Sequence, residues 1–170
     1  MALTRLGLNQ SINLATNVTG TLATGNGGTG ATSFTSGKIL QVVSQNFQTE
    51  SSTNSSTYSD TGLTVNITPS ATSSKVLVMV AMGMGYTSNG TESRFKLLRD
   101  STDLSEFIIN MGLDASGGGS ALNYLDTPNT TSQKTYKVQF KRNSGSGNCY
   151  ICVNNSGATI TAMEIGAWVH

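Results

Sequence analysis

The sequence predicts an all-β protein, an antiparallel β-sandwich of jelly-roll type with about nine strands. From Lys38 onward, runs that alternate apolar with polar residues recur at short intervals, and no segment keeps a helical period for long. The residues that are not apolar are mainly Ser, Thr, Asn and Gly, which is typical of the loops and outward positions of such a fold. An immunoglobulin-like sandwich is the alternative, but the chain lacks a Cys-Trp-Cys framework.

The chain is expected to have two parts, an extended arm over residues 1–37 and a β-sandwich domain over residues 38–170. The arm has neither a helical pattern nor a convincing strand pattern, and its second half is rich in Gly and Thr. Such a segment should be disordered alone and become ordered only against another surface, either sister chains or a larger assembly. Its scattered aliphatic residues would make that contact: Leu3, Leu6, Leu8, Ile12 and Leu14.

Nine stretches have the two-residue period of a strand. The first is long, and its alternation shifts in the way that a bulge would produce. Pro69 and Pro128 each end a strand, because proline cannot donate to a ladder of hydrogen bonds. The triplet from Gly117 to Gly119 is expected to be a loop. In chain order, the expected strands cover about 38–50, 63–67, 75–86, 94–98, 106–111, 122–124, 136–141, 149–153 and 163–169.

The stretch 75–86 (KVLVMVAMGMGY) is the longest nearly charge-free apolar run, and the rest of the fold must accommodate it. Its even-numbered side chains form one face of a strand, whereas Leu77, Met79 and Ala81 form a second apolar face. A strand with two apolar faces is expected at the centre of a sheet, with cover on both sides. We expect the outer cover to be another copy of the chain, so that Leu77 and Met79 lie in a subunit interface.

In the last expected strand, two alternating sets of side chains compete for the core. Met163, Ile165 and Val169 are expected to face the core. Glu164 and Trp168 should then point outward or into a subunit interface, where Trp is enriched. The alternative for Trp168 is that it covers an end of its own sandwich.

Composition and charge exclude several classes of partner. Only 11% of residues are charged and the formal net charge is +1, so there is no basic field for nucleic acid or anionic lipid. Partners must therefore be held by shape and by neutral polar groups. The first residues lack the apolar run of a signal peptide and no stretch could span a membrane, so synthesis in the cytoplasm without membrane insertion is expected.

The motifs that could hold a cofactor or a metal fail their structural tests. Residues 25–30 fit the pattern G-x-G-x-x-G, but no strand precedes them and no helix follows, so no cofactor is expected. Cys149 and Cys152 form a C-x-x-C pair, but in an extended strand they point to opposite faces and cannot hold one ion. Because His170 is the only histidine, no metal site is expected, and the cysteines should be reduced, half-buried thiols.

The acidic residues do not suggest an enzyme. Hydrolysis of a polysaccharide needs two carboxylates that face each other across a groove, and the nine acidic residues are scattered along the chain. Asp100, Asp103 and Glu164 would be the carboxylates to replace in a test of that activity. A Ser-His-Asp set would depend on His170, and a chain terminus is a poor place to preorganise one.

Segment 22–32 (LATGNGGTGAT) resembles a short sequence that recurs before the terminal domain of many bacteriophage tail fibres, usually closer to LPVANGGTGAT. The usual Pro-Val-Ala is replaced here at 23–25. Three more pieces, 37–43, 68–78 and 163–165, resemble the small β-sandwich tips of such fibres. The resemblance implies a virion structural protein, made in the host cytoplasm and located on the phage tail or a surface appendage. It also implies a homotrimer whose arm attaches to other virion proteins and whose distal domain binds a glycan or protein of the host surface.

The alternation of strand direction predicts which loops a receptor would touch. With the arm at one end of an antiparallel sandwich, the distal loops are 51–60, 86–93, 112–119 and 142–148. Aromatic rings and amides suit sugar faces and hydroxyls, although exposed polar loops are also the default of any sandwich. The receptor-binding candidates in these loops are Tyr58, Tyr86, Asn89, Glu92, Arg142 and Asn143. Two alternatives remain open: a capsid or baseplate decoration protein without a receptor role, and a polysaccharide-cleaving tip.

Overall fold

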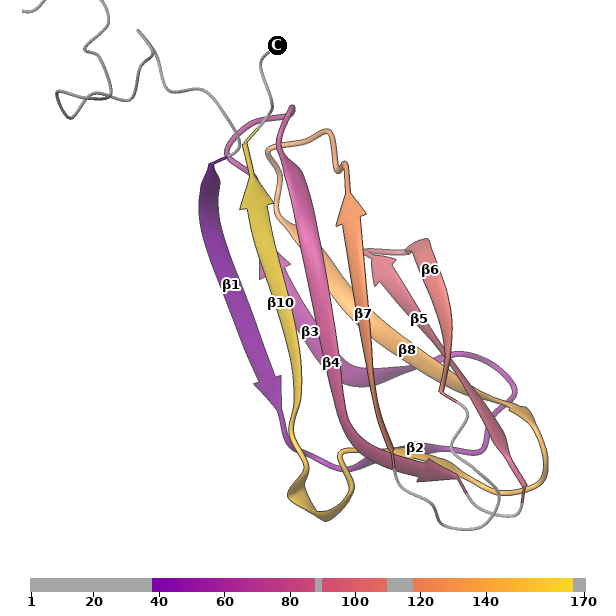
Figure 1. The fold of residues 1–170 in the computed structure, drawn as a ribbon. Coiled ribbons are helices and arrows are strands. Elements are labelled where there is room, and N and C mark those ends of the chain that lie inside the picture. The colour runs from indigo at the N-terminus through magenta and orange to yellow at the C-terminus, as the bar shows by residue number, and fades with distance from the viewer. Residues whose placement is uncertain (1–37, 88–89, 110–117, 167–170) are drawn as a thin grey trace, which may run out of the picture. The chain divides into compact units, whose positions relative to one another are not determined.

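The computed structural model describes residues 38–87, 90–109 and 118–166, which form β-strands joined by loops and one short 3₁₀ helix (Figure 1). No α-helix occurs within these residues, so the all-β prediction is confirmed. The strands are β1 (Ile39–Phe47), β2 (Ser51–Thr53), β3 (Ser59–Ile67), β4 (Lys75–Thr87), β5 (Glu92–Arg99), β6 (Thr102–Ile109), β7 (Gly118–Asp126), β8 (Lys134–Ser144), β9 (Cys149–Ile151) and β10 (Ala158–Ile165), and the 3₁₀ helix is Val153–Asn155.

Several predicted features lie outside the described residues. For Tyr86, only the backbone of its strand is described. The features outside are the arm 1–37 with Leu3, Leu6, Leu8, Ile12, Leu14 and the glycine segment, together with Asn89, the loop residues 112–117, and Trp168, Val169 and His170.

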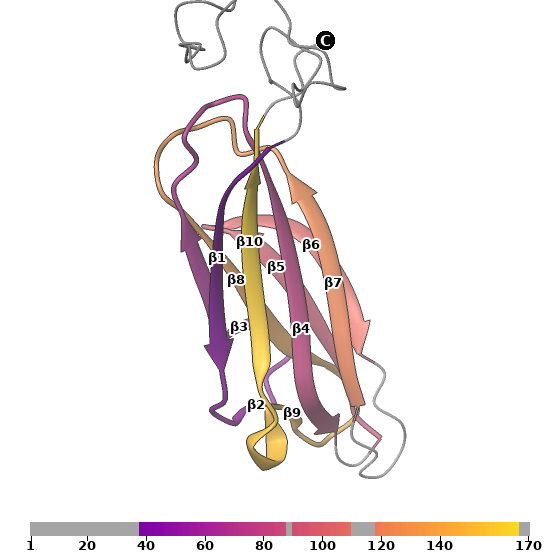
Figure 2. The ribbon, with the colours of Figure 1, turned by 60° about the vertical axis from the view of Figure 1, so that its left-hand side comes forward.

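The strands form two sheets in which every pair is antiparallel. One sheet has the order β1-β10-β4-β9-β2, and β7 also pairs with β4; the other has the order β3-β8-β5-β6. In Figure 2 the two sheets lie one behind the other. β4 therefore pairs with β10, with β7 and, at its end, with β9, as the prediction of a central strand over 75–86 required.

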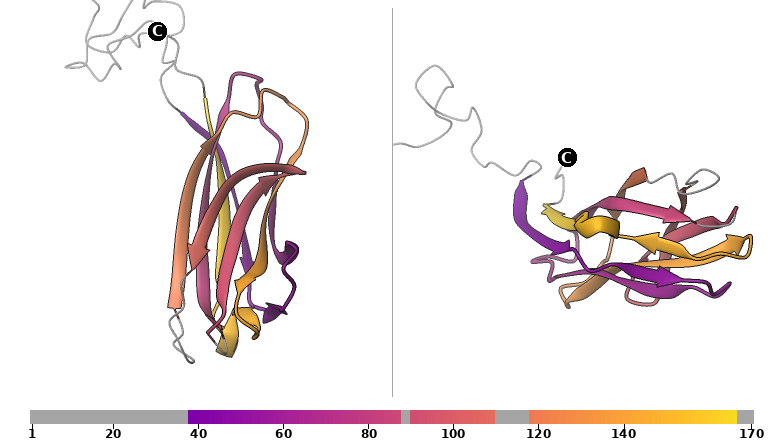
Figure 3. Two further views of the ribbon diagram at one scale, coloured as in Figure 1. Left: turned by 90° about the vertical axis from the view of Figure 1, so that its right-hand side faces the viewer. Right: turned by 90° about the horizontal axis from the view of Figure 1, so that it is seen from below.

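The hydrophobic core lies between the two sheets, which are seen from two further sides in Figure 3. Val76, Val78 and Val80 of β4 are at most 2% exposed and face it. The second sheet contributes aromatic rings, among them Phe95 of β5 and Phe140 of β8, whose ring centroids are 5.9 Å apart. Burying each valine stabilises the fold by roughly 1.5 to 3 kcal/mol, so the inner face of β4 is a main contributor.

Two strand segments form where the sequence predicted a loop. β2 lies in a Ser- and Thr-rich stretch with no strand pattern, and it exists because Ser51 and Thr53 pair with β9. Gly118 and Gly119, predicted to be in a loop, begin β7, where Gly118 pairs with Gly85 of β4. In both places the strand forms because a partner strand that is distant in sequence supplies the hydrogen bonds. The local sequence pattern alone does not indicate a strand there.

The orientation predicted for the last strand is wrong. In β10 the residues that face the core are Ala158, Ile160, Ala162 and, fully buried, Glu164, whereas Met163 and Ile165 lie on the outer face. Along β10, Thr159 and Thr161 alternate with the inward residues in the ordinary way. The alternation then continues through Met163 and Glu164 although their polarity is reversed, and this reversal misled the prediction.

The described chain begins and ends at the same end of the sandwich, which we call the Lys38 end. There the Gly166 amide donates a hydrogen bond of 2.9 Å to the Lys38 carbonyl oxygen. The connections 68–74 and 127–133 lie at this end, whereas β2, β9 and the 3₁₀ helix lie at the opposite end (Figure 1). The predicted distal loops 51–60 and 142–148 are at that opposite end, because each strand reverses direction as expected.

Candidate functional site

The outer face of the larger sheet carries an apolar row that crosses four strands. Val42 of β1 pairs with Met163 of β10, Met163 pairs with Leu77 of β4, and Leu77 pairs with Leu125 of β7. At the two ends of the row, Val42 is 53% exposed and Leu125 is 50% exposed. None of the described elements covers these side chains. The row is therefore an apolar surface available to a partner.

Neighbouring positions on this face are apolar toward the Lys38 end and polar toward the other. Toward Lys38, Ile39 is 61% exposed and Leu40 is 44% exposed. In the other direction the next row contains Ser44 and Thr161, whose hydroxyls are 2.9 Å apart. Among the described outward positions of β1, β10, β4 and β7, Lys75 is the only charged residue. A partner on this face would thus meet apolar and neutral polar groups.

The structure separates the predicted interface residues. Leu77 and Met79 lie on the outer face of β4, as predicted, and both are partly buried. Glu164 does not lie there, because its side chain is inside the sandwich and 0% exposed.

Glu164 is a buried carboxylate held by neutral donors. The Ser70 amide donates to its Oε1 at 2.7 Å, the Ser70 hydroxyl at 2.6 Å, and Gln41 Nε2 donates to its Oε2 at 2.6 Å. Gln41 Nε2 also donates to the Thr68 carbonyl oxygen at 2.6 Å. The carboxylate therefore fastens the connection 68–74 to β1 and β10.

The charge of Glu164 is maintained by these hydrogen bonds. Burial alone would raise the pKa of Glu164, but the bonds from Ser70 and Gln41 outweigh burial and lower the pKa to about 2. The Ser74 hydroxyl, buried nearby, adds to the effect although it makes no well-aligned hydrogen bond. The run Thr68-Pro69-Ser70 indicates a turn in the sequence, but it does not show that Ser70 contacts Glu164.

Tyr58 lies against the outer face of the smaller sheet. Its ring centroid is 4.4 Å from Lys96 Nζ of β5 and 4.8 Å from Lys141 Nζ of β8. Burial, with the neighbouring Glu106 carboxylate of β6, raises the pKa of Tyr58. The two ammonium groups stabilise the ring in this position through cation–π contacts.

The other described receptor candidates meet at the end opposite Lys38. Asn143 Nδ2 donates to Glu92 Oε2 at 3.1 Å, and Glu92 Oε1 is 3.4 Å from Arg94 Nε. The Arg142 amide donates to the Ser55 carbonyl oxygen at 2.8 Å, which attaches the loop before β3 to β8. Glu92, Arg142 and Asn143 thus belong to one corner of the sandwich.

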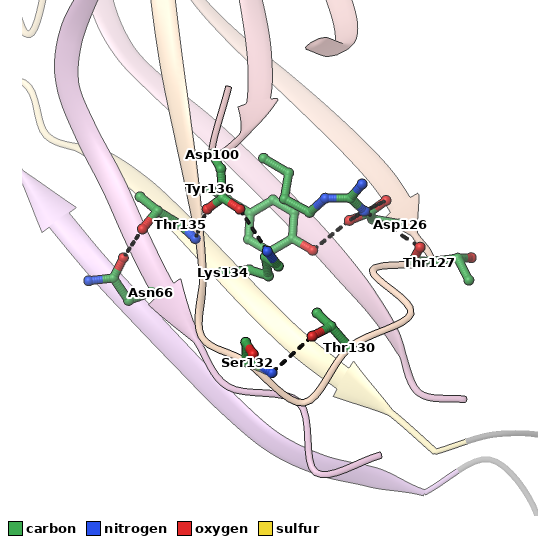
Figure 4. A network of polar contacts seen from close by, with 10 residues as sticks. Asn66, Asp100, Asp126, Thr127, Thr130, Ser132, Lys134, Thr135 and Tyr136 are labelled. Carbon is green, nitrogen blue, oxygen red and sulfur yellow. Dashed lines mark hydrogen bonds and ion pairs between the residues drawn. The ribbon is translucent and has the colours of Figure 1, made fainter. Parts of the chain in front are cut away.

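A buried polar network at the Lys38 end was not predicted from the sequence. Asp126 receives hydrogen bonds from the Tyr136 hydroxyl at 2.6 Å and from Arg99 Nη1 at 2.9 and 2.8 Å. In Figure 4 the Tyr136 ring points toward Asp126 at the start of the connection that contains Thr127 and Thr130. Burial and the Asp126 carboxylate raise the pKa of Tyr136, so its hydroxyl remains a donor. The network fastens the connection 127–133.

The three carboxylates considered for hydrolysis have separate partners. Asp100 is 2.9 Å from Lys134 Nζ, and Asp103 is 3.0 Å from Lys96 Nζ. The hydrogen bonds from Lys134 and from the Thr135 amide lower the pKa of Asp100 (Figure 4). Glu164 belongs to β10 of the other sheet, and its side chain is buried inside the sandwich. No two of these carboxylates share a hydrogen-bond or ion-pair partner within the described residues.

The two cysteines are more buried than predicted. Cys149 is 0% exposed and Cys152 is 1% exposed, and neither forms a disulfide. The prediction of opposite faces is wrong because β9 ends at Ile151, and Cys152 turns inward with a left-handed φ of 56°. Burial raises the pKa of the Cys149 thiol to about 11 and raises that of Cys152 as well. Both thiols should therefore be unreactive.

Comparison with known proteins does not identify the chain. A scan against protein-family models and a search of the curated proteins found no match. Within the described residues no group of three or more His, Cys, Asp or Glu side chains could hold a metal ion. No helix in that part of the chain is long and apolar enough to cross a membrane.

Proposed function

We propose that the chain is a virion structural protein of a bacteriophage, a homotrimeric tail fibre whose arm 1–37 attaches to the particle and whose β-sandwich binds the host cell surface. The identification with a virion rests on the resemblance of segment 22–32 to tail-fibre sequences. The observation that carries the assembly is the apolar row from Val42 to Leu125, which no described element covers.

The strand order supports the finer assignment of a jelly roll. Four long strands of one sheet, β1-β10-β4-β7, interleave in sequence with the four of the other, β3-β8-β5-β6. Apart from the β5–β6 hairpin, the chain crosses between the sheets at each connection of these long strands. Two Greek keys wound together have this connectivity, which is common in capsid and lectin domains.

The chemistry of the outer face supports assembly into a trimer. A stable monomer seldom exposes a continuous apolar row with so little charge beside it. Three copies can turn these faces toward a common axis, and obligate interfaces of this kind bury more than roughly 2,000 Å² per pair. Leu77 and Met79 would lie near the centre of that interface.

The positions of the two ends support the receptor role. Lys38 follows the arm and precedes β1 at one end, whereas Glu92 begins β5 and Arg142 and Asn143 lie in the last residues of β8, at the opposite end. If the arm is held by the particle, the opposite end is the part that can reach a cell. Tyr58, flanked by two lysines, is a candidate whose removal would also disturb packing, so it is a poorer test residue.

Adsorption of phage to host cells tests the proposal. We expect Arg142→Ala and Asn143→Ala to slow adsorption while the oligomer persists. Gln133→Ala removes an exposed amide of similar type at the Lys38 end and should leave adsorption unchanged. Unchanged adsorption in both distal variants would argue against the receptor role and favour a decoration protein. Electron microscopy that locates the chain on a capsid or baseplate would decide for that alternative.

A further inference from the structure

Two hollows flank strand β3 along the side of the sandwich. One, of about 300 Å³, lies where β3 separates from β8, and the other, of about 330 Å³, lies between β3 and β1. Gly62 and Thr64 line both hollows, so the hollows are neighbours on either side of β3, and we call the two together the trough. Figure 2 shows β1 and β3 next to each other on this side.

The trough is built by a bulge in β3. The pairing of β3 with β8 is interrupted between Asp60 and Thr64, which opens the first hollow. At the bulge Gly62 has a φ of +95°, and a Cβ there would lie 2.7 Å from the Phe47 ring. Gly62 therefore suits this position, and the lining that the two hollows share carries no side chain there.

The hollow between β1 and β3 has an apolar floor and a neutral polar rim. Val43, Phe47 and Val65, which belong to the core or pack against it, form the floor, and the exposed residues Thr64, Gln45, Asn46 and Asn66 form the rim. Sites of this size with a few polar groups over an apolar base are typical of small-ligand binding.

The rim groups have hydrogen-bonding capacity left over. Asn66 Oδ1 accepts from Thr135 Oγ1 at 2.7 Å, and in Figure 4 its nitrogen points away from Thr135. Asn46 Oδ1 accepts from Thr159 Oγ1 at 3.1 Å. Among the described residues, neither amide nitrogen has a partner. Gln45 uses its nitrogen in a bond of 3.3 Å to its neighbour, which leaves its carbonyl oxygen as an acceptor.

The trough as a whole is neutral. Its charged groups are Asp60 and Lys137, and these two are paired at 3.0 Å. A phosphate or a carboxylate would find no unpaired cation there, and a metal ion would find a single carboxylate. Hydroxyls both donate and accept, so they match a rim of free amide donors and acceptors.

We propose that the trough around Gly62 binds an uncharged, hydroxyl-rich ligand, a neutral oligosaccharide whose linked sugars occupy the two hollows. The inference deepens the proposed function and rests on it for the source of the sugar, the surface of a host cell. The surface that contacts the host cell would then include the trough on the side of the sandwich as well as the corner that contains Glu92, Arg142 and Asn143.

The test uses the full chain and a panel of immobilised neutral and anionic oligosaccharides, followed by calorimetric titration with each one that is bound. We expect binding to at least one neutral oligosaccharide. The double variant Gln45→Ala/Asn66→Ala removes two exposed rim amides and should weaken that binding at least about tenfold. Gln45→Trp, which fills the hollow, should weaken it too, whereas the control Gln133→Ala should not.

Three results would overturn the inference: no neutral oligosaccharide is bound, only anionic ones are bound, or the rim variants bind as well as the parent chain. A change of oligomeric state in the double variant, with no loss of sugar binding, would instead assign the trough to a second copy and also overturn it. A trimer that binds no neutral sugar refutes this inference and leaves the assembly standing. A monomer that binds one through the trough refutes the trimer alone.

Discussion

Replacement of Glu164 by Gln tests how the Lys38 end is held together. The variant keeps the size of the side chain, but its amide nitrogen is itself a donor. It would face the donors from Ser70 or Gln41 that bond the carboxylate in the parent chain. The pKa of Glu164 is about 2 in the folded chain, against an ordinary value of 4.5. At about 1.4 kcal/mol for each pKa unit, the charge contributes about 3 kcal/mol to the free energy of unfolding at neutral pH.

The sign of the pH dependence follows from the lowered pKa. A carboxyl whose pKa is depressed by folding stabilises the fold above pH 4.5, and this contribution is lost as the pH falls toward 2. Glu164→Gln should therefore lower the free energy of unfolding by about 3 kcal/mol at pH 7. The difference from the parent chain should shrink steadily between pH 4.5 and pH 2, where the parent carboxyl also becomes neutral.

Urea unfolding followed by circular dichroism, at a fixed protein concentration and several pH values, measures this difference. Fixed concentration matters because the stability of an oligomer depends on it. Glu50→Gln, at an exposed carboxylate, is the matched control and should unfold like the parent chain at each pH. An equal loss at pH 7 and pH 3 in Glu164→Gln would refute the reasoning, because the loss would then come from packing and not from charge.

Three further predictions concern other parts of the fold. Leu77→Lys places a charge in the middle of the apolar row and should dissociate the oligomer in sedimentation experiments; a fully assembled variant would remove this face from the interface. The thiols of Cys149 and Cys152 should react with a disulfide reagent only after unfolding, and rapid reaction of the folded chain would contradict their burial. Tyr136→Phe leaves the buried Asp126 short of a 2.6 Å hydrogen bond and should lower the free energy of unfolding by about 1.5 to 3 kcal/mol, whereas no change in urea unfolding would show that the bond is not needed.

The parts of the fold that sequence reasoning located well are those with a strong and regular pattern. In β4 the residues Val76, Val78 and Val80 repeat the same β-branched side chain at every second position, so both the strand and its inward face were predictable. The second apolar face of β4, with Leu77 and Met79, was equally predictable. It is the surface on which the proposed assembly depends.

The orientation of β10 was not predictable from its own residues. A carboxylate at a core position suggests that the inward and outward faces of the strand have been assigned the wrong way round, unless its hydrogen-bond donors are known. Ser70 supplies two of these donors and is 94 positions away in sequence. The pairing of Asp126 with Tyr136 and Arg99 is hidden for the same reason. Such networks depend on three-dimensional proximity, and they leave no periodic signal in a single sequence.

The trough was hidden because it is created by a backbone irregularity. Gly62 lies within an alternating strand, where a single glycine can mark either a bulge or a simple substitution. Gln45 and Asn66 appear in the sequence as ordinary outward residues of two different strands. They line one hollow because β1 and β3 are neighbouring strands from different sheets.

The central claim is that the uncovered face of the larger sheet joins three copies of the chain, and analytical ultracentrifugation of the full chain tests it most directly. At micromolar concentration we predict a single species of about 53 kDa, three times the 17.7 kDa of one chain. Under the same conditions, a species of 17.7 kDa would show that the apolar row stays exposed in a monomer and would contradict the account.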